Sequence, residues 1–385
     1  MDSRLSPSEF QNLLSHLSDS LISKEAGEAH LHQVGGSENF RQHPRVRSFF
    51  RHHYQQRRKQ RYLCSFPKEL GGCSKYSIRS HSVQRNGGLS LIAEGGKVYS
   101  CVDFTTSPTT SISDPSPKLL GHQKQASVFF GFCGDHDRDL FKGAEVDAEQ
   151  PSPLVASTLH LRALLFERWC KENIQFQGYR EWMSAEPMKN DDVTSWVLDS
   201  VRYQERQGKY GAMDVDDQLQ KLLAGGLSSY QNRLKSYYMD FEGLPVVAAC
   251  GCFCPEFLRD GRSLYNLLDD NFRGPKLSIN IVPHTTESTR IWISWPLAED
   301  QKMQSFFDEL TVYPVNQQAS AMFSMAADTI ENIHFRPSFW ENLSLQQKRE
   351  FLGHMHNKAP GSSQYGARRM KFFGKRAATG FILAS

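Results

Sequence analysis

Three cysteines and one histidine stand in a pattern that metal ions favour. Cys64 and Cys73 enclose a loop that contains Pro67 and two glycines, and Cys133 and His136 follow as Cys-x-x-His. Tetrahedral zinc takes four thiolate or imidazole ligands, and a Cys₃His set meets that need. We therefore predict that these four residues bind one structural zinc ion. The alternative is that the cysteines are small buried apolar residues and that the histidine caps a helix.

A second histidine lies between the two ligand pairs and indicates different chemistry. His81 stands between Arg79 and Arg85, and Asp137 directly follows the last predicted zinc ligand. A histidine can take a proton from water while a carboxylate holds a divalent cation against a phosphate. The pair therefore predicts phosphodiester hydrolysis with magnesium or manganese. The alternative is a histidine at a strand end and a solvated aspartate at a helix start.

Positive charge is concentrated at two places in a chain whose net charge is only +3. Residues 41–85 hold 12 Lys and Arg against the single acid Glu69, residues 367–376 add five more, and the rest of the chain is therefore acidic. This layout indicates a polyanion partner, DNA or RNA, and a solvated basic arm is the alternative. The residues that we expect to contact nucleic acid are Arg57, Arg58, Lys59, Arg61, Arg79 and Arg85.

Two segments carry a resemblance to known proteins: Ser80-His81-x₄-Asn86 and Phe130-Gly131-Phe132-Cys133-x-x-His136-Asp137-x-x-Leu140-Phe141. The pattern resembles a group of uncharacterised bacterial proteins with a Cys…Ser-His…Gly-Phe-Cys-x-x-His-Asp core. That core is similar to zinc-bearing HNH (ββα-metal) endonucleases. The resemblance implies zinc ligation by the four residues above, His81 as general base, and Asp137 in place of the metal-binding helix residue. It covers about residues 60–145, with a looser similarity around 336–341.

Three features depart from the HNH pattern. Ser80 stands where an acid or a histidine usually precedes the base, and Asp137 stands where a histidine usually follows the second ligand pair. The two ligand pairs are also far apart in the chain. The sequence thus leaves three functions open. One is an endonuclease or its degenerate relative, for example in phage defence, and another is a non-catalytic zinc-stabilised module that binds nucleic acid or protein, or acts as a sensor. The third is a structural assembly protein organised by helices within residues 154–240.

The elements that must position these residues predict an α+β fold in four parts. Residues 1–59 comprise a helix and a basic segment, and residues 60–150 form the zinc-bound HNH-like (ββα) module. Apolar residues at spacings of three and four predict a central helical arm over 154–240. The arm either mediates a homo-oligomer or packs into the core. Residues 244–385 form a C-terminal α+β domain with a basic tail.

Hydrophobic patterns predict several individual elements. Alternation over 277–281 and 291–295 predicts a β-hairpin. Leu89, Leu91 and Ile92, placed before a Glu-Gly-Gly turn, predict a strand. Helical spacing predicts two or three C-terminal helices, at about 299–311, 317–332 and 344–356.

Several other classes find no support in the sequence. The chain has neither a phosphate-binding glycine loop nor a Gly-x-Ser-x-Gly nucleophile motif. Cys250, Cys252 and Cys254 alternate along one strand, and we interpret them as buried thiols rather than metal ligands. No apolar run is long enough for a membrane span, and the N-terminal residues lack the pattern of a signal peptide. We therefore expect a cytoplasmic protein with no membrane partner and with reduced cysteines.

Overall fold

The computed structural model describes residues 62–101, 117–146, 150–173, 209–258, 261–266, 272–356 and 376–383. The expected N-terminal helix and basic segment, including Arg57, Arg58, Lys59 and Arg61, lie outside the described residues. Most of the predicted basic tail lies outside them as well.

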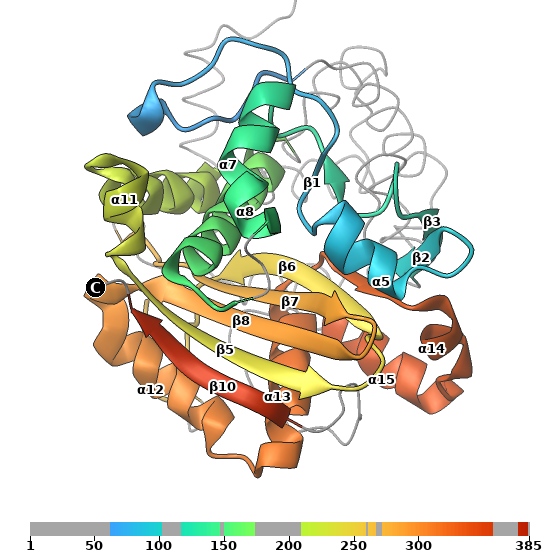
Figure 1. Cartoon of the computed structure of the whole chain (residues 1–385). Helices are drawn as coiled ribbons and strands as arrows, with labels where there is room; N and C mark the ends of the chain where they lie inside the picture. Colours follow the sequence, from blue (N-terminus) through green and yellow to red (C-terminus); the bar gives the residue numbers. More distant parts are fainter. Residues whose placement is uncertain are drawn as a thin grey trace, which may run out of the picture.

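An antiparallel sheet of eight strands forms the centre of the described part of the chain (Figure 1). Its strands follow the spatial order β10-β5-β8-β7-β6-β9-β2-β3. The strands are β2 (Lys97–Ser100), β3 (Lys118–Gly121), β5 (Leu234–Glu242), β6 (Val247–Phe253), β7 (Leu277–Thr285), β8 (Ser288–Pro296), β9 (Ile333–Phe335) and β10 (Arg376–Leu383). Residues from both halves of the chain therefore share one sheet.

The predicted hairpin is confirmed and lies in the middle of this sheet. Ile279 pairs with Ile293 and Ile281 pairs with Ile291 across β7 and β8. Successive side chains in a strand point to opposite faces, and nearly every residue of these two strands is buried. Both faces of the sheet must therefore be covered.

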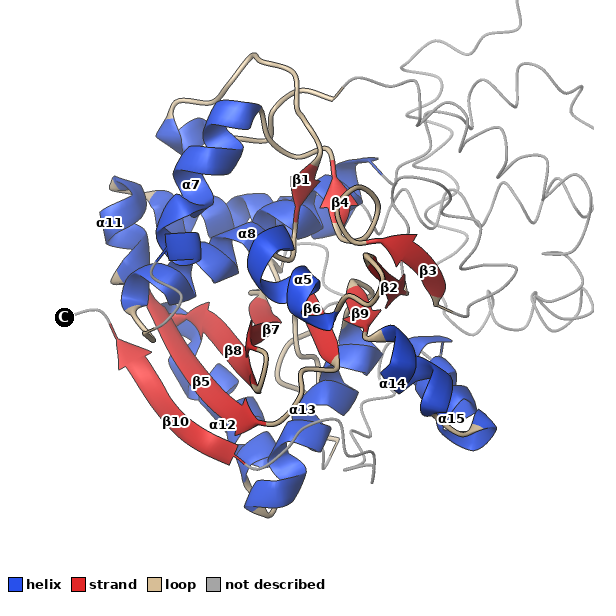
Figure 2. Ribbon diagram, turned by 45° about the vertical axis from the view of Figure 1, so that its right-hand side comes forward, coloured by secondary structure: helices blue, strands red, loops and turns tan. Residues whose placement is uncertain are grey.

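Helices cover the two faces (Figures 1 and 2). One face packs against α12 (Asp300–Thr311), α13 (Val315–Thr329) and α15 (Leu345–His356), which confirm the three predicted C-terminal helices. The short α14 (Pro337–Asn342) and the turn η3 (Leu297–Glu299) join these elements. The other face packs against α8 (Pro153–Asn173) and a helix over 209–223. Among the helices that the structure describes, none is both long and apolar enough to cross a membrane.

A smaller unit adjoins α8 on the second face. Strand β1 (Ser80–His81) pairs in antiparallel fashion with β4 (Val128–Phe129), and α7 (Gly134–Val146) follows β4 and contacts α8 (Figure 2). Phe129 meets Phe166 and Trp169 of α8 edge to face. These aromatic contacts anchor the unit to the helical layer. Three short turns complete it: η1 (Lys68–Leu70), η2 (Arg85–Leu89) and α5 (Ser90–Ile92).

The helical arm predicted over 154–240 packs into the core and ends earlier than predicted. α8 packs along β6 and β7, so its apolar stripe belongs to the core, the second of the two alternatives. Gly225 and Gly226 have φ values of +98° and +85°, which end the helix over 209–223. Only the short α11 (Gly226–Gln231) follows, and from Leu234 onward the chain forms β5.

The strand predicted around Leu89 is wrong, because these residues are helical. Leu89 and Ile92 are fully buried, whereas Leu91, between them, is only partly buried. Two buried residues three positions apart fit one side of a helical turn better than one face of a strand.

Strand pairing and an ion pair join the predicted N-terminal module to the C-terminal part. β2 pairs with β9. The guanidinium of Arg336 donates to the carbonyl oxygens of Pro245 (2.8 Å) and Leu91 (2.6 Å) and lies 3.3 Å from the Glu94 carboxylate. The same carboxylate accepts hydrogen bonds from the backbone and hydroxyl of Ser338 at 2.7 and 2.6 Å. The segment around 336–341 therefore holds the two parts of the fold together.

Candidate metal centre

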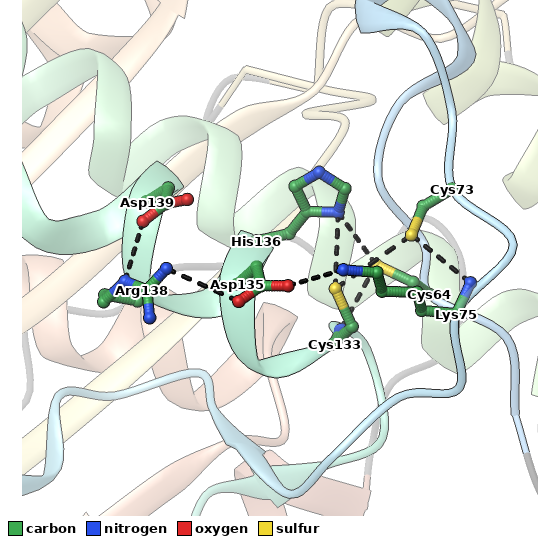
Figure 3. A network of polar contacts seen from close by, with 8 residues as sticks. All are labelled: Cys64, Cys73, Lys75, Cys133, Asp135, His136, Arg138 and Asp139. Atoms are coloured by element: carbon green, nitrogen blue, oxygen red, sulfur yellow. Dashed lines mark hydrogen bonds and ion pairs between the residues drawn. The ribbon is translucent and has the colours of Figure 1, made fainter.

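Cys64, Cys73, Cys133 and His136 converge on one point (Figure 3). Their ligand atoms all lie within 4.8 Å of one another. The Nδ1 atom of His136 is 3.4 Å from Sγ of Cys64 and 3.5 Å from Sγ of Cys133, and Cys73 and Cys133 have a sulfur–sulfur distance of 4.0 Å. Tetrahedral zinc bonds separate sulfur from nitrogen by about 3.6 Å and sulfur from sulfur by about 3.8 Å. The Cys₃His cluster could therefore hold a metal ion, as predicted.

The first ligand pair is positioned by a closed loop. The backbone N–H of Cys64 donates to the carbonyl of Lys75 at 2.9 Å, and Leu63 forms a β-bridge with Tyr76. Between these ends, Gly72 has a φ of +63° and donates to the carbonyl of Pro67 at 3.0 Å. A glycine adopts this left-handed conformation at little cost. The loop therefore reverses tightly enough to bring Cys73 back to Cys64.

The second ligand pair is positioned by two backbone hydrogen bonds and a helix. Ser65 donates to the carbonyl of Gly131, and Ile78 donates to the carbonyl of Phe132, both at 2.6 Å. These bonds tie both arms of the first loop to the residues just before Cys133. Helix α7 starts at Gly134, so His136 lies within its first turn, three residues after Cys133.

Backbone N–H groups point at all three sulfur atoms. Lys75 donates to Sγ of Cys73 at 3.4 Å, and Cys133 donates to Sγ of Cys64 at 3.2 Å. Phe66 also donates to Cys64, and Asp135 and His136 donate to Cys133. In each case one donor lies two residues after the cysteine. Such bonds orient the ligands and stabilise thiolates, which is the form that binds a metal.

The His136 ring is held by an aromatic stack. The ring of Phe66 lies parallel to it, with centroids 3.7 Å apart and an angle of 6° between the planes. This contact fixes the direction of Nδ1 toward the sulfur atoms. Phe66 comes from the first loop and His136 from α7, so the stack also joins the two half-sites.

The cysteines of the cluster differ in acidity. Burial, the largest influence, raises the pKa of the Cys64 thiol to about 11. Burial also raises the pKa of Cys133, but the N–H groups of His136 and Asp135 and the neighbouring thiols together bring it below its ordinary value. A bound divalent metal would favour the thiolate form of each of the three cysteines.

An ion pair closes the outer side of the cluster. The ammonium of Lys75 lies 2.6 Å from the Asp135 carboxylate, and this contact lowers the pKa of Asp135. Both side chains are more than half exposed, so the pair adds little to stability. The ammonium of Lys75 nevertheless lies between the cysteines and the start of α7, so it places a positive charge beside the sulfur atoms (Figure 3).

The remaining predicted site residues lie outside the cluster. His81, on β1, is half-buried, and Asp137 is half-buried in the first turn of α7. Among the described residues, the Cys₃His cluster is the group of three or more potential ligands that comes together, and neither residue belongs to it. Arg79 is exposed just before β1; the side chain of Arg85 lies outside the described set. Among the described residues, His81 and Asp137 thus form no group of three potential ligands that could hold magnesium or manganese.

A buried polar network next to His81 was not anticipated from the sequence. Ser82 contacts the hydroxyl of Ser127 at 2.7 Å and accepts from the side-chain amide of Asn332 at 2.7 Å. The side-chain oxygen Oδ1 of Asn332 lies 3.0 Å from Nε2 of His334, which is fully buried. Ser127 adopts a φ of +60°, an unfavourable value for serine. The contacts join residues up to 250 positions apart, so no local pattern could reveal them.

The interpretation of the three strand cysteines is confirmed for the two on β6. Cys250 and Cys252 are buried against the α8 layer, and the Cys252 thiol donates to the carbonyl of Ala163 at 3.7 Å. Burial raises the pKa of Cys250 to about 12 and raises that of Cys252 as well. These thiols are therefore protonated and inert at neutral pH.

A scan against protein-family models found no match to this chain, and searches of curated proteins and of solved structures found none either. The chain shows mixed helix and sheet and a Cys/His cluster that fits a zinc-binding module. The resemblance to HNH endonucleases therefore rests on the motif residues alone.

Proposed function

We propose that this chain is a zinc-stabilised protein that binds nucleic acid. The observation that carries the proposal is the convergence of Cys64, Cys73, Cys133 and His136 at distances that suit tetrahedral zinc. The loop that holds the first two ligands follows directly on the most basic segment of the chain. A bound zinc would give that loop a fixed shape, and the clustered cations would attract phosphates.

Binding is expected to weaken steeply with salt, because cations that contact phosphates release counterions. Arg79 is described and exposed, so it is the most direct residue to test. We expect Arg79→Gln to weaken binding and to reduce the slope of log K against log salt by about 0.7–0.9. Fluorescence anisotropy with labelled oligonucleotides at several salt concentrations measures both. Arg349→Gln is the control, because Arg349 is likewise exposed and lies on α15, which packs against the other face of the sheet. No wild-type binding at low salt would contradict the proposal.

Phosphodiester hydrolysis is the second candidate function. It is favoured by the order of β1, β4 and α7, two antiparallel strands and then a helix, with the second ligand pair, Cys133 and His136, where β4 leads into α7. In this proposal His81 takes a proton from the attacking water, and Asp137 would hold a magnesium or manganese ion against the phosphate, which would neutralise its charge. Water and phosphate oxygens would be the other ligands of that ion, because among the described residues no group of three potential ligands besides the Cys₃His cluster comes together.

Substituting His81 separates the two candidates. If the chain hydrolyses nucleic acid, His81→Ala should lower the cleavage rate by about 100-fold or more, because a general base contributes roughly that factor. Zinc content and binding should stay unchanged. His122→Ala is the matched control, because His122 is also half-buried and lies outside the cluster. Equal, negligible cleavage by wild type and variant, with or without magnesium or manganese, would leave binding as the function.

A further inference from the structure

The loop that carries Cys64 and Cys73 begins and ends as a short two-stranded ribbon. Residues 62–64 face residues 75–77: Leu63 bridges Tyr76, Cys64 donates to Lys75 and Ser77 donates to Tyr62. Alternation along the ribbon gives its two sides different roles. Tyr62 and Cys64 point inward and are buried, whereas Leu63 points outward.

The outward side of this ribbon is apolar. Leu63 and Tyr76 are each 58% exposed, and Ile78 is 46% exposed. Leu63 lies opposite Tyr76, and Ile78 follows Tyr76 by two positions, so the three side chains share one side. Tyr76 is the one aromatic residue among the exposed large hydrophobic residues of the described chain. Single exposed apolar residues are ordinary, but a grouped aromatic and two aliphatics indicate a contact surface.

The chain around the ribbon is basic in sequence. Arg79 is exposed and follows Ile78 along the chain, whereas Lys75, on the side of the Cys₃His cluster, is paired with the Asp135 carboxylate at 2.6 Å. Residues 75–85 contain no acidic side chain, and residues 41–85 contain one. An apolar surface among cations fits a partner that combines flat apolar groups with negative charge. Single-stranded nucleic acid has both, whereas a duplex hides the faces of its bases.

We propose that unpaired bases of single-stranded nucleic acid stack on Tyr76 between Leu63 and Ile78, with a neighbouring phosphate on Arg79. The inference rests on the proposed nucleic-acid binding and adds that the protein prefers single strands to a duplex. The metal and this surface are coupled through the chain. Cys64 follows Leu63 directly, and Cys73 lies three residues before Tyr76, so the Cys₃His cluster sets the pairing that brings Leu63 opposite Tyr76.

The test compares three zinc-loaded full-length chains: wild type, Tyr76→Ala and Tyr76→Phe. Each is titrated against a labelled single-stranded DNA, a single-stranded RNA of the same sequence and the corresponding duplex DNA. Stacking on an aromatic side chain contributes about 1–3 kcal/mol per base, so Tyr76→Ala should bind the single strands about 5- to 150-fold more weakly. Tyr76→Phe should bind like wild type, and duplex binding should change little. Because the two single strands share one sequence, the one that wild type binds more tightly shows whether the protein prefers DNA or RNA.

Two controls keep the result specific. Leu345→Ala removes another exposed apolar side chain, 74% exposed and distant in sequence, and should not affect binding. Zinc content of Tyr76→Ala should equal that of wild type, which shows that the cluster is intact. Equal affinity of wild type and Tyr76→Ala for both single strands would overturn the stacking proposal and leave nucleic-acid binding in place. Absence of wild-type binding to all three probes would overturn both, and the ribbon would then fit a protein partner.

Discussion

Replacing Cys64 with serine is expected to release zinc from the protein and to loosen the ribbon around it. A serine hydroxyl keeps its proton at neutral pH and is a poor zinc ligand, so three ligands would remain. Zinc content should fall from about one ion per chain to a small fraction. Structural zinc contributes about 10–16 kcal/mol in small zinc-finger peptides, and we expect much of the local order between Leu63 and Ile78 to depend on it.

Cys170→Ser is the matched control for this substitution. Cys170 and Cys64 are both 7% exposed, so both variants place a hydroxyl in a similarly buried position. Cys170 lies on α8 outside the Cys₃His cluster, and its variant should keep its zinc. Metal analysis gives the zinc content, and hydrogen exchange of the backbone amides of residues 62–78 gives the local order. The same zinc content and exchange rates in both variants would contradict a metal role for Cys64.

The fold is also expected to lose stability in mild acid, because two buried histidines stay neutral. Burial lowers the pKa of His160 and of His334 to about 3. In the unfolded chain each has a pKa of about 6.5 and takes up a proton as the pH falls. The unfolded state therefore binds more protons between about pH 6.5 and 3. Stability is fully present above this window and is lost as the pH decreases through it.

The expected size follows from the pKa difference. Each histidine contributes about 1.4 kcal/mol per pH unit in this window, so lowering the pH from 7 to 5 costs about 2 kcal/mol for each and about 4 kcal/mol for both. Urea unfolding at the two pH values measures the loss. The double variant His160→Gln/His334→Gln should have a lower free energy of unfolding than wild type at pH 7. Its loss between pH 7 and pH 5 should, however, be smaller than that of wild type by about 4 kcal/mol. Zinc release in acid affects wild type and the double variant alike, so it cancels when the two losses are compared. An unchanged pH dependence in the double variant would contradict the prediction.

The sequence predicts those elements whose pattern is local and unambiguous. Ile279, Ile281, Ile291 and Ile293 alternate over long runs, so the hairpin of β7 and β8 could be placed from them. Leu234 and Tyr237 also fit a helical stripe, and only the pairing of β5 with β8 decides that they form a strand. Short apolar runs such as Leu89–Ile92 are ambiguous for the same reason.

The candidate site, like the fold, has parts that could be predicted from the sequence and parts that could not. The grouping of Cys64, Cys73, Cys133 and His136 could be predicted, because Cys and His have few roles in which their spacing matters. The polar network of Ser82, Ser127 and Asn332 could not, because it depends on contacts between distant segments. Nor could the exposed side of the ribbon, because nothing in the sequence states that Leu63 lies opposite Tyr76. Tertiary pairing therefore supplied the surface that the motif alone did not contain.

X-ray absorption at the zinc edge on the purified wild-type chain tests the central claim most directly. The account predicts one zinc per chain, surrounded by three sulfur atoms at about 2.3 Å and one nitrogen at about 2.0–2.1 Å. A spectrum that requires only oxygen and nitrogen neighbours would contradict it. So would a chain that holds no zinc after purification and takes none up from solution.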